Sequence, residues 1–193
     1  MKSDLDLVQA ALEEDLPAGD ITTDALNLKP DGTCNAQIIA KEDLVLSGSR
    51  IATLVFQTLD RQIQCHWNFS DGALVPKGKT VVSLHGSKSE ILKGERTALN
   101  FLGRLSGVAT LTRTYVEATK GTQTKILDTR KTTPLLRRLE KEAVTHGGGT
   151  NHRISLSDRI LIKENHIRAA GGIRSAIESI RKNRGSIFIE IEV

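Results

Sequence analysis

The sequence predicts an α+β domain followed by a domain in which parallel strands alternate with helices. Two observations predict this order. Between Asn35 and Gly86, strand-like segments are separated by turn signals, which is typical of an antiparallel sheet. Beyond Gly121, strand and helix patterns alternate, which favours parallel strands joined by helical crossovers. The 193 residues, 38% of them apolar, are enough for one or two domains with buried cores.

The amino-terminal part begins with a helix. Ser3 is a plausible cap with Asp6 three positions later, and the pattern predicts that the helix ends at Pro17-Ala18-Gly19, before a turn-rich stretch. A second helix is expected near residues 50–59. Turn residues such as Asp71-Gly72 separate the expected strands. These strands cover residues 36–40, 63–67 and 80–84.

A long helical pattern then covers residues 89–120 and ends at Gly121. Gly103 and Gly107 inside this pattern predict a break or a close helix contact. The alternating part follows it. Its expected elements are a strand at 125–129, a helix at 134–145, a strand at 159–163, a helix at 173–181 and a strand at 186–193.

The last predicted strand has two different faces. One face carries Ile187, Ile189, Ile191 and Val193, and the other carries Ser186, Phe188, Glu190 and Glu192. The sequence stops inside this strand, and a sheet of about three strands would have open edges and uncovered apolar faces. We therefore expect the sequence to be a fragment or truncated copy of something longer.

Composition excludes several classes of protein. No apolar run approaches the ~18 residues of a membrane span. Acidic residues near the amino terminus interrupt any signal peptide, so we expect a cytoplasmic protein with no membrane partner. Cys34 and Cys65 are too few and too far apart for a disulfide framework or a zinc site, and we expect both to be reduced.

The net charge of +4 comes from one segment. Residues 128–168 contain nine Lys and Arg against five Asp and Glu, whereas the two kinds are equal in number elsewhere. This distribution indicates an anionic ligand.

Two cations, Arg130 and Lys131, lie between a predicted strand and a predicted helix. Thr133 is the expected helix cap, with Pro134 at the first helical position. Adjacent cations and hydroxyls at a helix amino terminus suit phosphate or carboxylate groups. The alternative is a capped helix with solvated charges.

A run of three glycines, 147–149, precedes His152 and Arg153. Glycines bring backbone amides close to a ligand, and the two side chains would add an imidazole and a guanidinium; the alternative is a plain glycine loop. Lys163 ends a predicted strand, where ligands of α/β folds bind, although a lone lysine is more commonly a solvated charge.

Glu190 and Glu192 share one strand face, ~7 Å apart. Inside a barrel, two such carboxylates need a metal or cations; the alternative is an exposed polar strand face. Arg96 lies on the long helix, where an exposed salt bridge with a neighbouring carboxylate is the default interpretation.

Read together, several motifs resemble the quinolinate phosphoribosyltransferase family over nearly the whole chain. In chain order the motifs are residues 14–23 (EDLPAGDITT), 95–102 (ERTALNFL), 105–110 (LSGVAT), 128–134 (DTRKTTP), 147–153 (GGGTNHR) and 161–166 (LIKENH). One motif alone would be weak, but this ordered set is highly specific. The sequence departs from the family pattern at Leu135, Glu142 and Ile154-Ser155, and we expect the first two to be tolerated helix positions.

The resemblance implies an α+β amino-terminal sandwich domain, residues 1–110, followed by the first part of an incomplete α/β, TIM-like barrel, residues 111–193. It implies a homodimer that converts quinolinate and phosphoribosyl pyrophosphate to nicotinate mononucleotide, pyrophosphate and CO2 in de novo NAD biosynthesis, with Mg²⁺ as cofactor. The family's later strands, which carry another metal-site aspartate and phosphate-binding loops, are absent here, so we expect little activity from this chain alone.

The resemblance also implies a role for each candidate residue. Lys131, Lys163 and Glu192 are the implied catalytic residues, and Glu192 is also the implied metal ligand. Arg96 is the arginine lent by the partner subunit. The implied substrate-binding residues are Arg96, Arg130, Lys131, His152, Arg153, Lys163 and Glu192.

Three rival hypotheses stay open. A paralogous pyrophosphorylase associated with molybdenum transport shares the fold and many motifs. A truncated, non-catalytic subunit would only dimerise with a longer one. A basic module that binds nucleic acid would show steep salt dependence, but six aromatic residues are few for stacking on bases.

Overall fold

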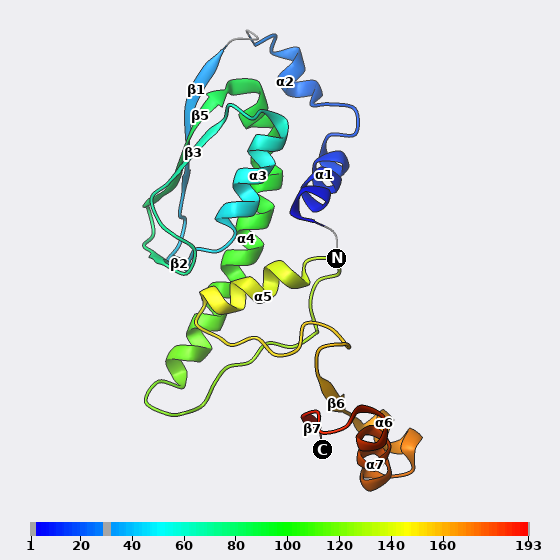
Figure 1. The fold of residues 1–193 in the computed structure, drawn as a ribbon. Helices are drawn as coiled ribbons and strands as arrows, with labels where there is room; N and C mark the ends of the chain where they lie inside the picture. Colours follow the sequence, from blue (N-terminus) through cyan, green and yellow to red (C-terminus); the bar gives the residue numbers. More distant parts are fainter. Residues whose placement is uncertain (1–2, 29–31, 193) are drawn as a thin grey trace. The chain divides into compact units, whose positions relative to one another are not determined.

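The computed structural model describes residues 3–28 and 32–192 of the chain. They form two compact units, Met1–Asn151 and His152–Val193, each of which is described by itself (Figure 1). The domain boundary predicted at residue 110 stays a prediction. Within the described ranges, no helix combines the length and the apolar character that a membrane crossing requires.

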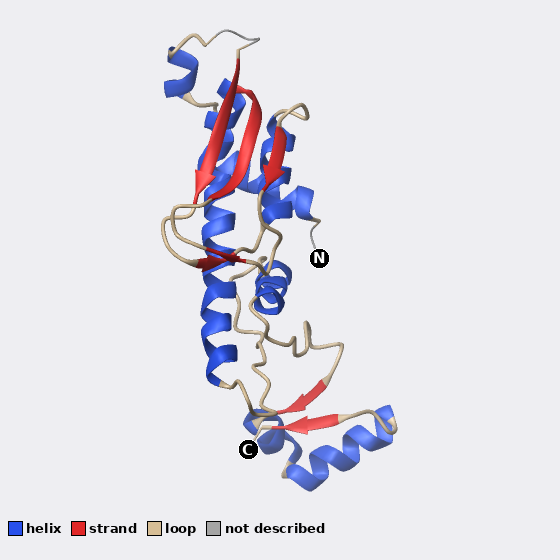
Figure 2. Ribbon diagram, turned by 90° about the vertical axis from the view of Figure 1, so that its left-hand side faces the viewer, coloured by secondary structure: helices blue, strands red, loops and turns tan. Residues whose placement is uncertain are grey.

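The first unit contains the predicted antiparallel sheet. Strands β1 (Thr33–Ile39), β5 (Thr80–Ser87) and β3 (Gln64–Trp67) pair antiparallel in the order β1-β5-β3. A separate two-residue ladder, which the sequence did not predict, joins β2 (Leu44–Val45) and β4 (Leu74–Val75). Helices lie along one face of the three-stranded sheet (Figure 2). Exposed and half-buried residues alternate along β1, as expected for a sheet with one covered face.

Helix α1 (Asp4–Asp15) confirms the predicted capping box, because the Ser3 hydroxyl accepts from the Asp6 amide and Asp6 accepts from the Ser3 amide. The turn-rich stretch predicted after it is wrong in part. A short helix, α2 (Ile21–Ala25), forms there. Its cap, Asp20, accepts hydrogen bonds from the backbone amides of Thr22 and Thr23, at 3.0 and 3.1 Å. The Thr23 hydroxyl also donates to Asp20, and this bond is the main reason that the pKa of Asp20 is lowered.

Helices α3 (Ser49–Leu59) and α4 (Lys88–Ala118) form the core together with the sheet. The helix predicted near residues 50–59 and the long one at 89–120 are thereby confirmed. Gly94 lets the two helices approach closely, since a Cβ there would lie 2.9 Å from the Leu59 side chain. The core combines side chains of α1, α3, α4, β5 and α5. Its members include Val8, Val55, Phe56, Val82, Leu84, Leu105 and Leu139.

The break predicted at Gly103 and Gly107 is wrong. Helix α4 is continuous through both positions, and within the described chain nothing lies within 4 Å of a Cβ built on either glycine. Both glycines instead line a groove of about 510 Å³ beside the β1–β2 loop.

The segment after α4 also differs from the prediction. Residues 125–129 do not form a regular strand. Only one parallel bridge joins Leu127 and Thr150, with the Thr150 amide donating to Ile126 O at 2.8 Å and the Asp128 amide to Thr150 O at 3.2 Å. This bridge joins one residue pair, whereas a strand is defined by a ladder of consecutive pairs.

Helix α5 (Arg137–His146) begins later than predicted. Its N-cap is Leu136, without a side-chain hydrogen bond, so Thr133 and Pro134 are not the cap and first position. Leu135 is not a helix position at all, since it is exposed and adopts φ +67°. Glycine adopts this left-handed conformation without strain, whereas a leucine adopts it at a cost. Glu142 does lie within α5, as predicted.

The second unit is small. Strand β6 (Ile160–Ile162) pairs in parallel with β7 (Ile189–Ile191), and helices α6 (Glu164–Ala170) and α7 (Ile173–Arg184) lie between them in the chain. This confirms parallel strands joined by helical crossover, although α6 was not predicted and β7 is shorter than the predicted 186–193, whose last residue lies outside the described residues.

The cysteines are free, as predicted: Cys34 lies on β1 and Cys65 on β3. Burial raises the pKa of the Cys65 thiol.

Candidate active site

The cation loop, residues 128–133, carries Arg130 and Lys131. Arg130 is half-buried, and its Nε has no hydrogen-bond partner among the described residues although the atom itself is buried. Lys131 is exposed, and its backbone amide donates to Thr129 Oγ1 at 3.0 Å. Buried polar atoms in folded proteins are nearly always paired, so the orphaned Nε indicates an acceptor that completes the site.

The loop begins at a buried ion pair that sequence reasoning missed. Asp128 pairs with Lys141 of α5, and their side chains are 6% and 3% exposed. With its amide nitrogen turned toward these acceptors, Asn151 donates to Lys141 O at 2.9 Å and to Asp128 Oδ2 at 2.6 Å. No local signal marks this pair in the sequence, because residues two apart on a helix lie on different faces and Lys141 is two positions from the buried Leu139 and Ala143.

The loop ends at a second buried charge, Glu140 of α5. Its carboxylate accepts from the Thr133 backbone amide at 3.1 Å and from the Thr133 hydroxyl at 2.7 Å. Arg104 of α4 donates to the same carboxylate from Nε at 2.9 Å and from Nη2 at 2.7 Å. Burial alone raises the pKa of Glu140, but the hydrogen bonds from Thr133 and Arg104 outweigh it and hold the pKa below its usual range.

The three glycines do not present amides to a ligand, so that prediction is wrong. The amides of Gly147, Gly148 and Gly149 donate to Ala143 O, Thr145 O and Val144 O at the end of α5, at 2.9–3.0 Å. A Cβ on Gly147 would lie 2.5 Å from Ala109 O, and one on Gly149 would lie 2.7 Å from a Val144 methyl. The run is the plain glycine loop of the alternative interpretation, needed for close packing.

In the second unit, each of the two predicted carboxylates lies next to a basic side chain. Glu190 Oε2 lies 2.6 Å from His152 Nε2, and Glu192 Oε2 lies 2.7 Å from Lys163 Nζ. Lys163 directly follows β6, as predicted, and its backbone amide donates to His166 Nδ1 at 3.0 Å. The strand register, with Leu161 opposite Glu190, brings these residues together. Each of the two carboxylates therefore has a nitrogen partner within the second unit.

Arg153 is more buried than a ligand-contacting arginine would suggest. It is 5% exposed, and its Nη1 donates to Arg159 O at 3.3 Å. It lines a cavity of about 370 Å³ together with apolar side chains of β6 and α7. Ile154-Ser155, where the sequence departs from the family pattern, lies next to Asp158. The Asp158 carboxylate accepts a hydrogen bond from the Ile154 amide at 2.6 Å, and this bond lowers the pKa of Asp158.

Arg96 lies exposed on α4. The helical salt bridge expected by default is not present among the described residues, where no ion pair of Arg96 occurs. The site residues thus fall into two groups. Arg96, Arg130 and Lys131 belong to the first unit, and His152, Arg153, Lys163 and Glu192 belong to the second.

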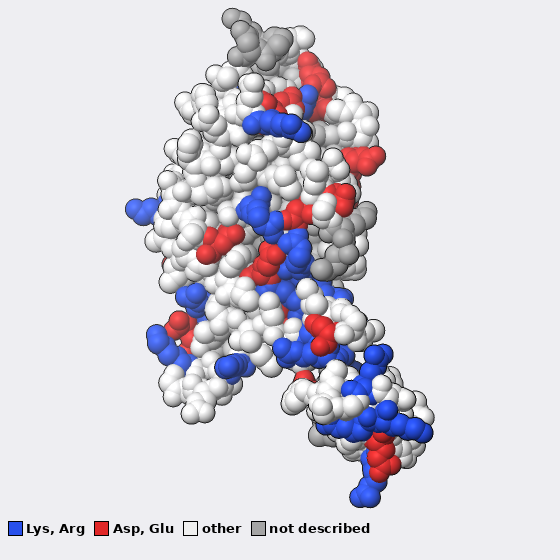
Figure 3. Space-filling view, viewed as in Figure 1, with Lys and Arg blue, Asp and Glu red and all other residues white. Residues whose placement is uncertain are grey.

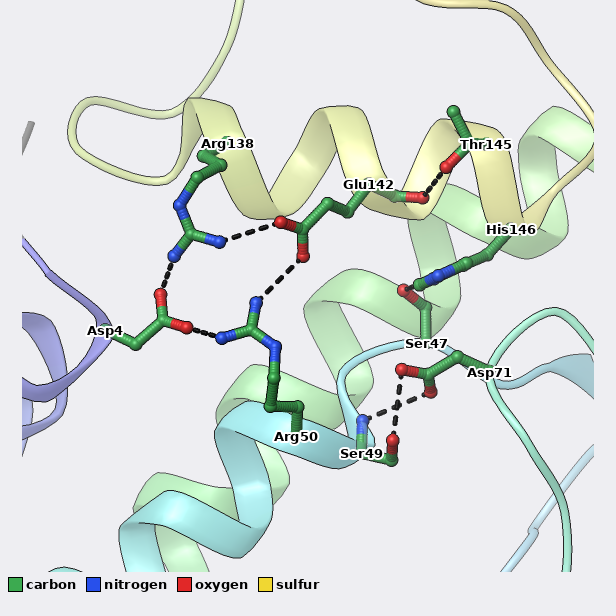
Figure 4. Close-up of polar contacts among 9 residues, drawn as sticks. All are labelled: Asp4, Ser47, Ser49, Arg50, Asp71, Arg138, Glu142, Thr145 and His146. Atoms are coloured by element: carbon green, nitrogen blue, oxygen red, sulfur yellow. Dashed lines mark hydrogen bonds and ion pairs between the residues drawn. The ribbon is translucent and has the colours of Figure 1, made fainter.

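A ring of ion pairs lies beside the glycine loop in the first unit (Figure 4). Asp4 of α1 pairs with both Arg50 of α3 and Arg138 of α5, and Glu142 pairs with the same two arginines at 3.1 and 2.7 Å. Glu142, one of the departures from the family pattern, completes a ring that joins α5 to α1 and α3. His146 Nδ1 lies 2.8 Å from Ser47 Oγ in the same region.

Charge on the visible surface agrees with an anionic ligand. In Figure 3, Lys and Arg outnumber Asp and Glu over the smaller unit, whereas both signs are mixed over the larger one. No group of three or more His, Cys, Asp or Glu side chains that could hold a metal ion occurs in the described ranges.

Comparison with known proteins adds sequence evidence. The family model "Quinolinate phosphoribosyl transferase, N-terminal domain" matches residues 20–106, and the model of the C-terminal domain matches residues 108–193. A Bacillus subtilis relative described as a nicotinate-nucleotide pyrophosphorylase (carboxylating) is 43% identical over 93% of this chain. A quinolinate phosphoribosyltransferase (decarboxylating) of Nicotiana tabacum is 39% identical over 96% of it. The chain spans 62% of the Bacillus protein and 54% of the tobacco protein.

Solved structures agree. A nicotinate-nucleotide pyrophosphorylase from Francisella tularensis matches 98% of this chain with a TM-score of 0.92 and 44% identity, and the match covers 67% of that chain. The enzyme of the same name from Ehrlichia chaffeensis matches 100% of this chain with a TM-score of 0.93 and 39% identity, covering 70% of that chain. With both domain models matched and this similarity in fold and sequence, the chain belongs to the quinolinate phosphoribosyltransferase family.

Proposed function

We propose that this chain provides substrate-binding residues of a quinolinate phosphoribosyltransferase of de novo NAD biosynthesis. In this reaction the pyridine nitrogen of quinolinate bonds to C1 of the ribose, and pyrophosphate leaves with the electrons of the broken C–O bond. The carboxylate beside the new bond then departs as CO2, and a proton takes its place on the ring. The products are nicotinate mononucleotide, pyrophosphate and CO2.

The observation that carries this proposal is membership of the family, together with the presence of the basic residues that its motifs assign to the substrate. Relatives at 43% and 39% identity bear the name of this activity. Arg130, Lys131, His152, Arg153 and Lys163 all occur in the motifs that assign them. The same relatives favour quinolinate over the molybdenum-associated paralogue.

The proposed roles are mainly electrostatic. Arg130, His152, Arg153 and Lys163 bind the two carboxylates of quinolinate, and Lys131 binds the phosphoribosyl donor. The orphaned Nε of Arg130 supports this assignment, since an anion would supply the acceptor that the buried atom lacks. Cations fixed before the reaction stabilise the charge that develops on the leaving pyrophosphate and on the ring during loss of CO2. The ion pair with Glu192 at 2.7 Å orients the Lys163 side chain for this role.

Magnesium fits the proposed site in a limited way. Mg²⁺ in enzymes is commonly held by one or two carboxylates together with substrate phosphates. Glu192, directly after β7, offers one exposed carboxylate, which is paired with Lys163, and Glu190 on β7 offers a second. When bound, the ion would neutralise charge on the pyrophosphate of the donor, with Glu192 as its ligand from this chain.

The remaining parts of the proposal follow the family. The second domain is the first part of an incomplete barrel, and the protein acts in the cytoplasm as a homodimer in which Arg96 reaches the partner's site. Arg96 is exposed on α4 and has no ion pair with the residues that the structure describes, which supports this role because the side chain is available to another subunit.

Isothermal titration of the chain with quinolinate tests the proposal. We expect binding that Arg130→Ala weakens at least tenfold, the loss of one charge-assisted contact. Arg61→Ala, an exposed arginine in the turn before β3, is the matched control and should bind as the wild type does. Nicotinate, which lacks the second carboxylate, should bind more weakly than quinolinate. Equal binding by Arg130→Ala and wild type, or no binding at all, would overturn the assignment.

A further inference from the structure

Helix α5 contacts the cation loop at its beginning, middle and end. Lys141 pairs with Asp128 at the start of the loop. In the middle, Arg137 donates from Nε to Thr132 Oγ1 at 3.1 Å and from Nη2 to Arg130 O at 3.5 Å. At the end, Glu140 accepts from both the amide and the hydroxyl of Thr133.

The loop itself offers little to fix its shape. Between residues 129 and 133, the hydrogen bonds within the loop are Lys131 N to Thr129 Oγ1 and Thr132 N to Arg130 O, each 3.0 Å. The segment forms neither a helix nor a ladder. A segment with few backbone bonds of its own opens easily unless side chains hold it. The contacts from α5 therefore supply most of the order around Arg130 and Lys131.

Two of these contacts use buried charges, which is an expensive arrangement. Glu140 is 6% exposed and Lys141 is 2% exposed, side by side in the sequence, and each is fully paired. Buried ion pairs contribute little net stability compared with apolar residues of similar size, because desolvation offsets their attraction. Their value lies in directional contacts that only one arrangement of the loop satisfies.

We propose that Glu140 and Lys141 are positioning residues that clamp the two ends of the cation loop, so that Arg130 and Lys131 are held ready for an anion before it arrives. The proposal rests on the proposed function and deepens it. Arg104 of α4 belongs to the same clamp, since its Nε and Nη2 orient the carboxylate of Glu140. Neither Glu140 nor Lys141 needs to touch the substrate for this role.

The test compares Glu140→Gln and Lys141→Met with Glu117→Gln and Lys120→Met. The control pair lies exposed near the end of α4 and carries the same charges. In the free protein, hydrogen exchange of the amides at 129–133 should quicken at least tenfold in the first two variants and stay unchanged in the controls. The double variant Asp128→Asn/Lys141→Met removes both charges of the buried pair, so it leaves no unpaired buried charge that could unfold the protein. Its amide exchange should match that of Lys141→Met.

Anion affinity is measured with two probes, quinolinate and inorganic pyrophosphate. Dissociation constants should rise at least tenfold in Glu140→Gln and in the Asp128→Asn/Lys141→Met pair. The effect should disappear when Arg130 and Lys131 are already alanine, because a positioning residue acts only through the residues it positions. A purely structural residue would instead weaken binding by the same factor in both backgrounds.

The outcomes separate this proposal from the proposed function. If the chain binds pyrophosphate but not quinolinate, the proposed function is contradicted. The positioning role of Glu140 and Lys141 is then still tested by the affinity of the variants for pyrophosphate. Faster exchange with unchanged affinity would overturn the clamp even if quinolinate binds. Equal losses with and without Arg130 and Lys131 would overturn it too, as would a wild-type chain that binds neither anion.

Discussion

The two units differ in how they bury apolar side chains. The first has one connected core that draws on α1, α3, α4, α5 and the sheet. In the second, Ile162 and Ala176 are the buried apolar residues among those described, whereas Phe188 is 73% exposed. The same kind of secondary structure is therefore supported by very different amounts of packing, so local order in the second unit depends more on polar contacts.

The charges differ in the same way. Asp128–Lys141 in the first unit is buried, whereas Lys163–Glu192 in the second has side chains that are 41% and 61% exposed. Exposed pairs contribute little stability and are screened by salt. The comparison teaches that the Asp128–Lys141 contact of the first unit is shielded from solvent, while the Lys163–Glu192 contact of the second is one that solvent can replace.

The largest expected effect tests the contrast in packing. Phe56→Ala in α3, at 2% exposure, should lower the free energy of unfolding by about 3–5 kcal/mol, because it leaves a cavity in the core. Phe188→Ala, the matched change in the second unit, should alter it by less than about 0.5 kcal/mol. Urea unfolding followed by circular dichroism measures both. Comparable losses would mean that Phe188 is packed as tightly as Phe56.

The glycine loop gives the next contrast. Gly147→Ala should destabilise the protein by about 2–3 kcal/mol, because its Cβ would lie 2.5 Å from Ala109 O and 2.6 Å from the Thr112 Cβ. Gly103→Ala on α4 meets open space and should stabilise by about 0.5–1 kcal/mol through helix propensity. Thermal unfolding of the two variants should therefore shift in opposite directions, and a shift in the same direction would contradict the packing role of the loop.

The buried carboxylate of Glu140 predicts a pH dependence of the stability of the first unit. Its folded pKa lies below the ordinary value of 4.5, so its contribution is present above that value and is lost as pH falls through the folded pKa. Glu140→Gln should lose about 1–2 kcal/mol of stability at pH 7. Between about pH 5 and pH 2, the variant's stability should then fall less steeply than that of the wild type. Asp20 and Asp158, whose pKa values are also lowered, act equally in both proteins. Parallel pH profiles would show that Glu140 has no such role.

The smallest effect concerns Leu135. A left-handed conformation at φ +67° strains a leucine, and the side chain is 73% exposed, so Leu135→Gly should stabilise by about 0.5–1 kcal/mol. The gain is limited because glycine also frees the unfolded chain. A rise in the melting temperature with no change in the α5 signal by circular dichroism supports this account. A lower melting temperature would mean that Leu135 makes a packing contact after all.

The fold was predictable where local signals were strong. The Ser3 capping box, the alternating strands of the first sheet and the long apolar stripe of α4 each depend on neighbours close in sequence, which is why the prediction succeeded. The prediction failed where the contacts of a segment are made with residues distant in the sequence. In the described chain, residues 125–129 pair through one isolated bridge, between Leu127 and Thr150, instead of a ladder. The start of α5 moved because Thr133 bonds to Glu140 and Arg104 instead of capping the helix.

The candidate site shows the same division. Sequence motifs were enough to select Arg130, Lys131, His152, Arg153 and Lys163, because residue type and order in the chain identify the family. They did not reveal Glu140 or Lys141, because helix charges usually face solvent and only burial marks these two as exceptional. They also assigned the glycines to a ligand, whereas packing against α4 is what requires them.

By itself, the sequence determined the family, the main helices and strands and the identity of the candidate basic residues, since these follow from short patterns of residue type. Tertiary structure alone decided which charges are buried, which amides are already bonded and where Arg130 is left with an unpaired donor. The physical reason is that burial and pairing are set by distant segments brought together on folding, and no local pattern specifies them.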